Sequence, residues 1–190
     1  VTAFLEDSKG QFWIGTGANG LYRINKSDIS AEEHYILDPQ DENSFASSVV
    51  LAISEDKNKD VWIGSGGEGL FKYSRDKNNF TRVTIDDGLP SNTITSLKND
   101  NEGFLWMGTR NGTARIKTQE GKFLIQGYNR TDGLSGRIFY QDAIAVGKYG
   151  KMYFGGPEGM AVVNPLDIKP NEEKPLIAIT GIAAIDQSNK

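Results

Sequence analysis

Short apolar segments alternate with polar turns along most of the chain. Residues 51–54 (LAIS), 61–64 (VWIG), 69–74 (GLFKYS) and 80–85 (FTRVTI) show an apolar period of two and are bounded by Gly, Asn or Asp. Such a pattern is typical of short, half-buried β-strands that tight turns connect. We therefore predict consecutive strands throughout this part of the chain.

The stretch KDVWIGSGGEGLFKY, residues 59–73, concentrates glycines between two of these segments, at Gly64, Gly66, Gly67 and Gly69. Glycine-rich loops cradle phosphate groups in some proteins, and in others glycine supplies the positive φ angles of a tight hairpin. One copy of the stretch does not separate these two interpretations.

A repeat along the chain favours the hairpin. The segments 1–25, 49–73, 93–117 and 142–164 share one order of elements: an alternating strand, a polar turn, an aromatic-apolar-glycine strand, a glycine-rich turn and another strand. Their aromatic positions, Trp13, Trp62, Trp106 and Tyr153, are 49, 44 and 47 residues apart. This spacing fits a blade of four antiparallel strands, so we predict an all-β partial propeller of about four blades.

The repeated residues then have structural roles. Four copies in one register, with neither a Gly-Lys-Ser/Thr sequence nor a helical pattern after them, argue against a phosphate loop. The four aromatic positions could stack on sugars, but their recurrence inside a strand favours a core wedge between neighbouring blades. A glycine follows each aromatic-apolar pair, where we expect strands or blades to approach closely; these glycines are Gly15, Gly64, Gly108 and Gly155.

The repeat divides the chain into units at 1–44, 45–90, 91–136 and 137–164. In the first unit we expect residues 27–43 (SDISAEEHYILDPQDEN) to form an irregular insertion between its third and fourth strands or in place of part of the fourth. The fourth unit shows three strands. Residues 165–190 predict a proline-rich linker and then a strand, which could begin another domain, complete the fourth unit or pair with a second copy.

Composition narrows the classes of function. The 190 residues carry 21 basic and 25 acidic side chains, a net charge of −4, without a basic block, so we expect no nucleic-acid partner. No apolar run is long enough to insert directly into a membrane, and no signal peptide is present in this segment. The lack of cysteine excludes thiolate metal sites, and the single histidine, His34, is expected at the surface and excludes a histidine pair.

Candidate catalytic and metal-binding groups are sparse. Asp56, Asn58 and Asp60 fit the start of a calcium loop, but Val61 and Gly67 occupy the places where such a loop needs glycine and glutamate. Asp and Asn in such turns usually make local hydrogen bonds. We therefore expect no catalytic residues, no metal and no cofactor in this chain.

The repeat resembles the two-component regulator propeller repeat of bacterial hybrid two-component sensors. The similarity rests on DSKGQFWIGTGANGL, DKNKDVWIGSGGEGL and DNEGFLWMGTRNGTA and on the connections DDGLPSN and TDGLSGR. The fourth unit departs from it, with Gly147 where an Asp is expected and Tyr153 in place of Trp. Residues 164–186 resemble the lead-in to the immunoglobulin-like domain, named for three tyrosines, that follows the last propeller in this family.

The resemblance implies a periplasmic sensor region of an inner-membrane histidine kinase of Bacteroidetes type, whose gut members typically sense oligosaccharides. It implies a non-catalytic segment that binds ligand or transmits the signal. A complete ring in this family holds about seven blades, so we expect the open blade edges to drive self-association, as a dimer. The alternatives are a protein-interaction scaffold that binds no small molecule, and a propeller lyase or hydrolase.

Ligand contacts in propellers usually come from loops at one face. The turns between second and third strands and the connections between units carry a polar and aromatic mix that suits a carbohydrate or a partner protein. The candidate ligand-binding residues are Arg110, Asn111, Arg137 and Tyr140. The alternative is a solvated loop without a ligand.

Overall fold

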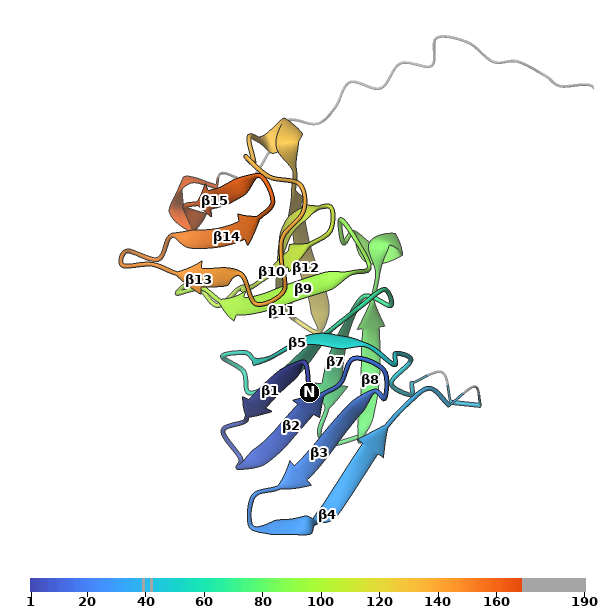
Figure 1. The fold of residues 1–190 in the computed structure, drawn as a ribbon. Helices are drawn as coiled ribbons and strands as arrows, with labels where there is room; N and C mark the ends of the chain where they lie inside the picture. The colour runs from blue at the N-terminus through green and yellow to red at the C-terminus, as the bar shows by residue number, and fades with distance from the viewer. Residues whose placement is uncertain (39, 42, 169–190) are drawn as a thin grey trace, which may run out of the picture.

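Four antiparallel sheets follow one another along the chain, from the blue sheet to the orange-red sheet in Figure 1. The computed structural model describes residues 1–38, 40–41 and 43–168. Blade 1 consists of β1 (Ala3–Glu6), β2 (Gln11–Gly15), β3 (Leu21–Asn25) and β4 (Asp28–Tyr35). Blade 2 consists of β5 (Val50–Glu55), β6 (Val61–Ser65), β7 (Leu70–Ser74) and β8 (Asn79–Val83).

Blade 3 has the same plan and blade 4 is shorter. Blade 3 consists of β9 (Ile94–Asn99), β10 (Leu105–Thr109), β11 (Gly112–Gln119) and β12 (Lys122–Tyr128). Blade 4 consists of β13 (Ile144–Val146), β14 (Met152–Gly156) and β15 (Gly159–Val163). Three short 3₁₀ turns complete the regular structure of the described residues: η1 (Ile85–Asp87), η2 (Arg130–Asp132) and η3 (Pro165–Asp167).

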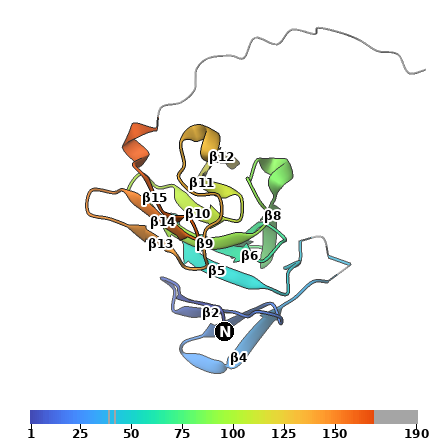
Figure 2. The same ribbon diagram turned by 45° about the horizontal axis from the view of Figure 1, so that its top comes forward.

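Each sheet is an antiparallel meander, and the sheets meet through their first strands. β1 packs on β5, β5 on β9 and β9 on β13, so these four strands form the inner edge of the arrangement (Figure 2). This is the geometry of successive propeller blades, and the predicted fold class is confirmed. The strand expected after residue 165 lies outside the described residues.

The expected insertion in the first unit was wrong, because residues 28–35 are the fourth strand of blade 1. β4 pairs with β3 through Leu21–Tyr35, Tyr22–His34 and Arg23–Glu33. The rings of Tyr22 and His34 stack with centroids 4.1 Å apart, and Arg23 pairs with Glu33. Cross-strand pairs of this kind stabilise a strand that buries little apolar surface. Since only Tyr35 of β4 is even half-buried, the apolar period that marks the other strands is absent.

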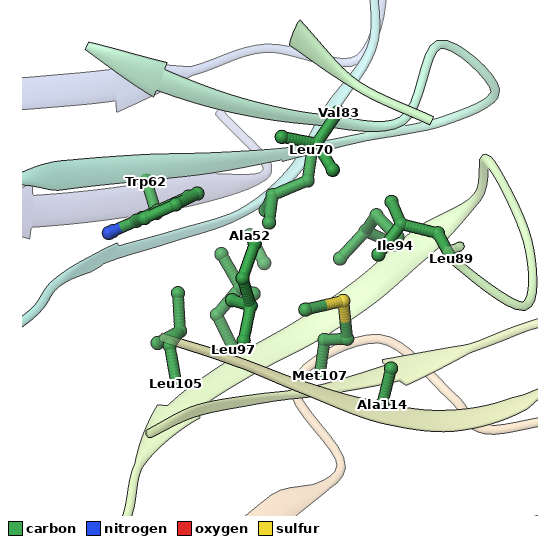
Figure 3. Packing of buried hydrophobic residues seen from close by; sticks show 11 residues of the cluster. Ala52, Trp62, Leu70, Val83, Leu89, Ile94, Leu97, Leu105, Met107 and Ala114 are labelled. Carbon is green, nitrogen blue, oxygen red and sulfur yellow. The ribbon is translucent and has the colours of Figure 1, made fainter. Parts of the chain in front are cut away.

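Three hydrophobic clusters lie between neighbouring blades. The cluster between blades 2 and 3 joins Ala52, Trp62 and Leu70 of blade 2 to Leu97, Leu105 and Met107 of blade 3, among others (Figure 3). Trp13 belongs to the cluster between blades 1 and 2, and Trp106 to the one between blades 3 and 4. All three indoles are at most 1% exposed, so each tryptophan fills the space between its own blade and the next.

The glycine after each aromatic-apolar pair lies where chains approach closely. A Cβ atom on Gly15 would lie 2.8 Å from Val50 Cβ, and one on Gly64 would lie 2.8 Å from Ile94 Cγ2. Val50 and Ile94 each belong to the first strand of the following blade. A Cβ atom on Gly108 would meet Ser96 Oγ at 2.5 Å. Glycine at these places therefore sets how closely blades and strands pack.

Each buried tryptophan is also bonded to the turn of its own blade. Trp62 Nε1 donates to Asp56 Oδ2 at 2.9 Å, and Asp56 Oδ1 accepts from the amides of Asn58 and Asp60. Asp7 bonds Trp13, and Asp100 bonds Trp106, in the same way at 2.8 Å. The Asp56 side chain is thus satisfied by the turn, as expected for a turn rather than a calcium loop.

Tyr153 does not occupy the core position that its place in the repeat predicts. It is half-buried, while its neighbours Met152 and Phe154 are fully buried against blade 3. Gly147 stands where the other blades have the tryptophan-binding Asp, and the Tyr153 ring lies over it: a Cβ atom on Gly147 would lie 3.2 Å from Tyr153 Cζ. Gly147 and Tyr153, the two residues that depart from the repeat, therefore lie in contact with each other.

Candidate functional site

The predicted ligand-binding residues lie at one end of the strands, in the turns between second and third strands and the connections between blades. We call this the connection face. One backbone hydrogen bond recurs on it: Gly20 N donates to Ser48 O, Gly69 N to Asn92 O and Gly112 N to Arg137 O. These glycines have φ angles of 69°, 91° and 98°, which explains why glycine ends each turn. The turns of blades 1 to 3 are thereby tied to the connections that lead into the next blade.

The connections themselves are built by a capping motif. Thr84 caps η1 and bonds Asp87 reciprocally, Gly88 follows with a φ of 107°, and Leu89 is buried below. Asn129, Asp132, Gly133 and Leu134 repeat this arrangement around η2. The Asp-Gly-Leu sequence therefore encodes a rigid turn with an apolar anchor, which fixes the loops of the face.

Asn111 joins two of these connections. Its Nδ2 donates to Pro90 O at 3.0 Å, and its Oδ1 accepts from Arg137 Nε at 2.9 Å. Both residues are exposed at the surface. The amide of Asn111 is occupied by structural bonds, while the terminal nitrogens of Arg137 remain at the surface in an orientation that Asn111 fixes. Of the four candidates, the structure brings together this pair.

Arg110 and Tyr140 are placed differently. The Arg110 side chain is exposed at the tip of the β10–β11 turn and makes no hydrogen bond or ion pair within the described residues. Tyr140 is 55% exposed, and its backbone amide donates to Gly155 O at 3.0 Å. The four residues are thus exposed on the turns and connections of one face, and the structure brings Asn111 and Arg137 into contact.

Gln141 is a functional candidate that sequence analysis missed. Its Nε2 donates to Thr2 O at 2.9 Å and to Leu51 O at 3.0 Å, so it connects the entry of blade 4 to blades 1 and 2. A single glutamine beside a tyrosine carries no sequence signal for such a long-range contact. Gln141 directly follows Tyr140 in the chain. A displacement of the loop that carries both residues would therefore disturb the contacts with Thr2 of blade 1 and Leu51 of blade 2.

The neighbouring Asp142 is the unusual acid of this region. Burial raises the pKa of its carboxyl above the ordinary 3.8. Its backbone has a φ of 56°, and its amide donates to Thr95 O at 3.2 Å. Within the described residues, no group of three or more His, Asp or Glu side chains could hold a metal ion. His34 stacks on Tyr22 of blade 1 and lies far from this region in the chain.

Comparison with known proteins agrees with this architecture. The family model of the two-component regulator propeller matches residues 1–18, 44–67 and 88–111. These ranges contain β2, β6 and β10, the strands that carry the three tryptophans. These three segments are similar to the two-component regulator propeller and make up about a third of the chain. The matched segments contain the Asp, Trp and Gly positions of blades 1 to 3, and blade 4 lies outside the match.

Similar proteins include a histidine kinase and the extracellular domains of two-component systems. Histidine kinase P4 of Formosa agariphila is 28% identical over 190 residues, which are 99% of this chain. Two solved structures, each described as the extracellular domain of a hybrid two-component system of B. thetaiotaomicron, match 87% of this chain with TM-scores of 0.72 and 0.68 and identities of 23% and 24%. The chain spans 14% of histidine kinase P4, and 22% and 24% of the two extracellular domains. The two structures show the fold alone.

Among the described residues, no helix is both long and apolar enough to cross a membrane.

Proposed function

We propose that this chain is a ligand-sensing and signal-transmitting segment of a hybrid two-component sensor, located in the periplasm, and that its ligand is an oligosaccharide. The observation that carries the proposal is the similarity to the regulator propeller in a chain that aligns over nearly its full length with a histidine kinase. The two similar structures are extracellular domains, which supports the periplasmic placement.

The connection face supplies the contacts in this proposal. Arg137, oriented by Asn111, presents guanidinium donors, and Tyr140, three residues further along the same connection, presents an exposed ring. Donors beside a flat aromatic ring suit a sugar, whose hydroxyl groups accept hydrogen bonds and whose ring face is apolar. Gln141 then links this loop to blades 1 and 2, so a movement of the loop on ligand binding can be transmitted to the inner strands.

The test is calorimetry of the chain and of the intact receptor against a panel of neutral, carboxylated and sulfated oligosaccharides. A variant that combines Arg110→Ala and Tyr140→Ala should abolish binding, and Arg137→Ala should weaken it at least tenfold. Lys148→Ala, an exposed residue in the β13–β14 turn, is the matched control. Unchanged affinity in both site variants would refute this location of the site, and no binding to any oligosaccharide would refute the ligand class.

The segment acts without catalysis in this proposal. Its single histidine stacks on a tyrosine, and the carboxylates of its turns are engaged in local hydrogen bonds. A ligand recovered chemically unchanged after incubation with the chain, by mass spectrometry, supports a sensor. Cleavage or elimination products would support the lyase or hydrolase alternative instead.

Self-association through the open blade faces is the second part of the proposal. The outer face of blade 1 presents Phe4, which is 59% exposed and packs against the tilted ring of Phe12 with centroids 5.5 Å apart. Blade 4 presents Met160 and Val162, which are 60% and 49% exposed. The three tryptophans are buried between blades, so the exposed apolar groups of these open faces are Phe4, Met160 and Val162. Light scattering across a concentration range should find a dimer that Phe4→Glu dissociates, and a monomer at all concentrations would refute it.

A further inference from the structure

A cavity of about 530 Å³ opens at the ends of the strands opposite the connection face. Three blades contribute to it, through the β1–β2 turn of blade 1, the β5–β6 and β7–β8 turns of blade 2 and the β11–β12 turn of blade 3. Its volume lies in the range of about 300 to 1,000 Å³ that is common for small-molecule sites. We call it the turn cavity.

Positive charge dominates the turn cavity. Five cations and two carboxylates line it. The carboxylates are Asp60 and Asp76, and the cations are Lys9, Lys59, Lys72, Arg75 and Lys77. Among the described residues, three of these cations have no ion-pair partner; they are Lys9, Lys59 and Lys77. The chain as a whole is acidic, so this concentration of cations is local.

The other two cations are fixed in place. Lys72 Nζ lies 2.7 Å from Asp60 and 5.5 Å from the centroid of the buried Trp62 ring. The Arg75 guanidinium lies 2.9 Å from the fully buried side chain of Asp7 and also reaches Glu55. Since both side chains are four-fifths buried and paired with carboxylates, they form a rigid floor whose positive charge is neutralised. The unpaired positive charge of the cavity comes from Lys9, Lys59 and Lys77.

Lys59 is the most informative of the five. Its φ is 69°, in the left-handed region, and the same turn position in the other three blades is glycine: Gly10, Gly103 and Gly150, with φ angles of 74°, 88° and 76°. A lysine in this conformation is strained relative to glycine. Blade 2 therefore keeps a strained cation at the rim of the cavity where the repeat otherwise has glycine. A strained residue at the rim of a cavity points to a function for Lys59.

The remaining lining suits a hydroxyl-rich molecule. Asn58, Asn79, Thr81 and Thr118 present amide and hydroxyl groups, and the half-buried Phe123 adds one apolar wall. We propose that the turn cavity binds a small acidic saccharide, whose carboxylate or sulfate group contacts Lys59 and Lys77 and whose hydroxyl groups contact the amide and hydroxyl side chains. The saccharide class rests on the proposed function, while the anionic group and the location rest on this cavity alone.

The test is isothermal calorimetry of the whole chain with three probes: tri-galacturonate, a sulfated disaccharide and neutral galactotriose. We expect at least one acidic probe to bind at least tenfold more tightly than galactotriose, with an affinity that falls as salt rises. Lys59→Gly combined with Lys77→Gln should weaken that binding at least tenfold. Lys98→Gln, an exposed lysine on β9 outside the cavity, should leave it unchanged.

The choice of variant separates an effect of the substitution on folding from its effect on ligand binding. Lys59→Gly places in blade 2 the residue that the other blades already have, so its thermal midpoint should equal or exceed that of the parent chain. Tighter binding of tri-galacturonate than of the sulfated probe would assign the anion as carboxylate, and the reverse order as sulfate; either supports the proposal. An unchanged affinity in the stable Lys59→Gly, Lys77→Gln variant would overturn the turn cavity but leave the proposed function. Equal binding of neutral and acidic probes would overturn the acidic class, and no binding of any probe would count against both.

Discussion

Blades 1 to 3 and blade 4 differ in how the first turn is joined to the core. In the first three blades a buried tryptophan donates to an aspartate whose other oxygen accepts two turn amides. In blade 4 the aspartate is replaced by Gly147 and the tryptophan by the half-buried Tyr153. The comparison teaches that the Asp and the Trp act together: one carboxylate joins the indole to the amides of the turn, and in blade 4 Gly147 instead gives the tyrosine ring room.

The largest difference between these regions should appear when the aromatic residue is removed. Trp106→Ala should lower the free energy of unfolding by about 3–5 kcal/mol, because a fully buried ring leaves a cavity between blades 3 and 4. Tyr153→Ala should lower it by about 1 kcal/mol, since the ring is only half-buried. Urea unfolding followed by circular dichroism measures both, and equal losses would break the comparison.

Loss of the acceptor should have the next largest effect. Asp100→Ala leaves the Trp106 indole N–H and the amides of Glu102 and Phe104 without their acceptor. We expect a loss of about 1–3 kcal/mol in the free energy of unfolding. Asp86→Ala, at an exposed position of η1, is the control and should change stability by less than about 0.5 kcal/mol. Similar values for the two variants would show that the Asp–Trp bond contributes little.

Two glycines of one turn region should respond differently to the same substitution. Gly64→Ala places a Cβ atom 2.8 Å from Ile94 Cγ2 and 3.0 Å from Ile94 O, so blades 2 and 3 must separate slightly. Overpacking of this kind costs about 1–3 kcal/mol, and the lower half of that range is expected for one methyl group. Gly67→Ala meets no atom within 4 Å and should be neutral in the same urea titration. A neutral Gly64→Ala would argue against close packing of the blades.

The smallest effect concerns the pH dependence of blade 1. Burial alone would raise the pKa of Asp7, but hydrogen bonds from Trp13, the Gln11 amide and Arg75 together lower it below the ordinary 3.8. A lowered folded-state pKa stabilises the fold above the unfolded-state value, and this contribution is lost as the pH falls below about 4. Thermal midpoints between pH 2 and 6 should therefore fall less steeply at the acidic end for Asp7→Asn than for the parent chain. Parallel curves would contradict the shift.

Much of the fold was accessible from the sequence because the repeat recurs at the level of single residues. The tryptophan spacing, the glycines after the aromatic strands and the Asp-Gly-Leu connections each reflect a local requirement for burial, close approach or a positive φ. The strand at residues 28–35 was missed because its partners are Tyr22 and Arg23, and such cross-strand pairs leave no apolar period in the strand itself.

The residues of the candidate sites also divide into those that the sequence could place and those that it could not. Arg137 and Tyr140 could be placed on one face because topology puts turns and connections at the same ends of the strands. The bridging role of Asn111, the long-range bonds of Gln141 and the cations of the turn cavity could not be placed, since each joins residues from different blades.

The sequence by itself determined the blade, since the period of two, the turn glycines and the Asp–Trp pair act within about forty residues. Only the tertiary structure decided what lies between blades: which faces are covered, that Lys9 of blade 1 and Lys59 of blade 2 share one cavity, and that Gln141 reaches Thr2. The physical reason is the separation in sequence over which each kind of interaction acts. Backbone geometry and turn hydrogen bonds are set by neighbouring residues, whereas a cavity or a surface arises from the packing of separate sheets, which no single stretch of sequence specifies.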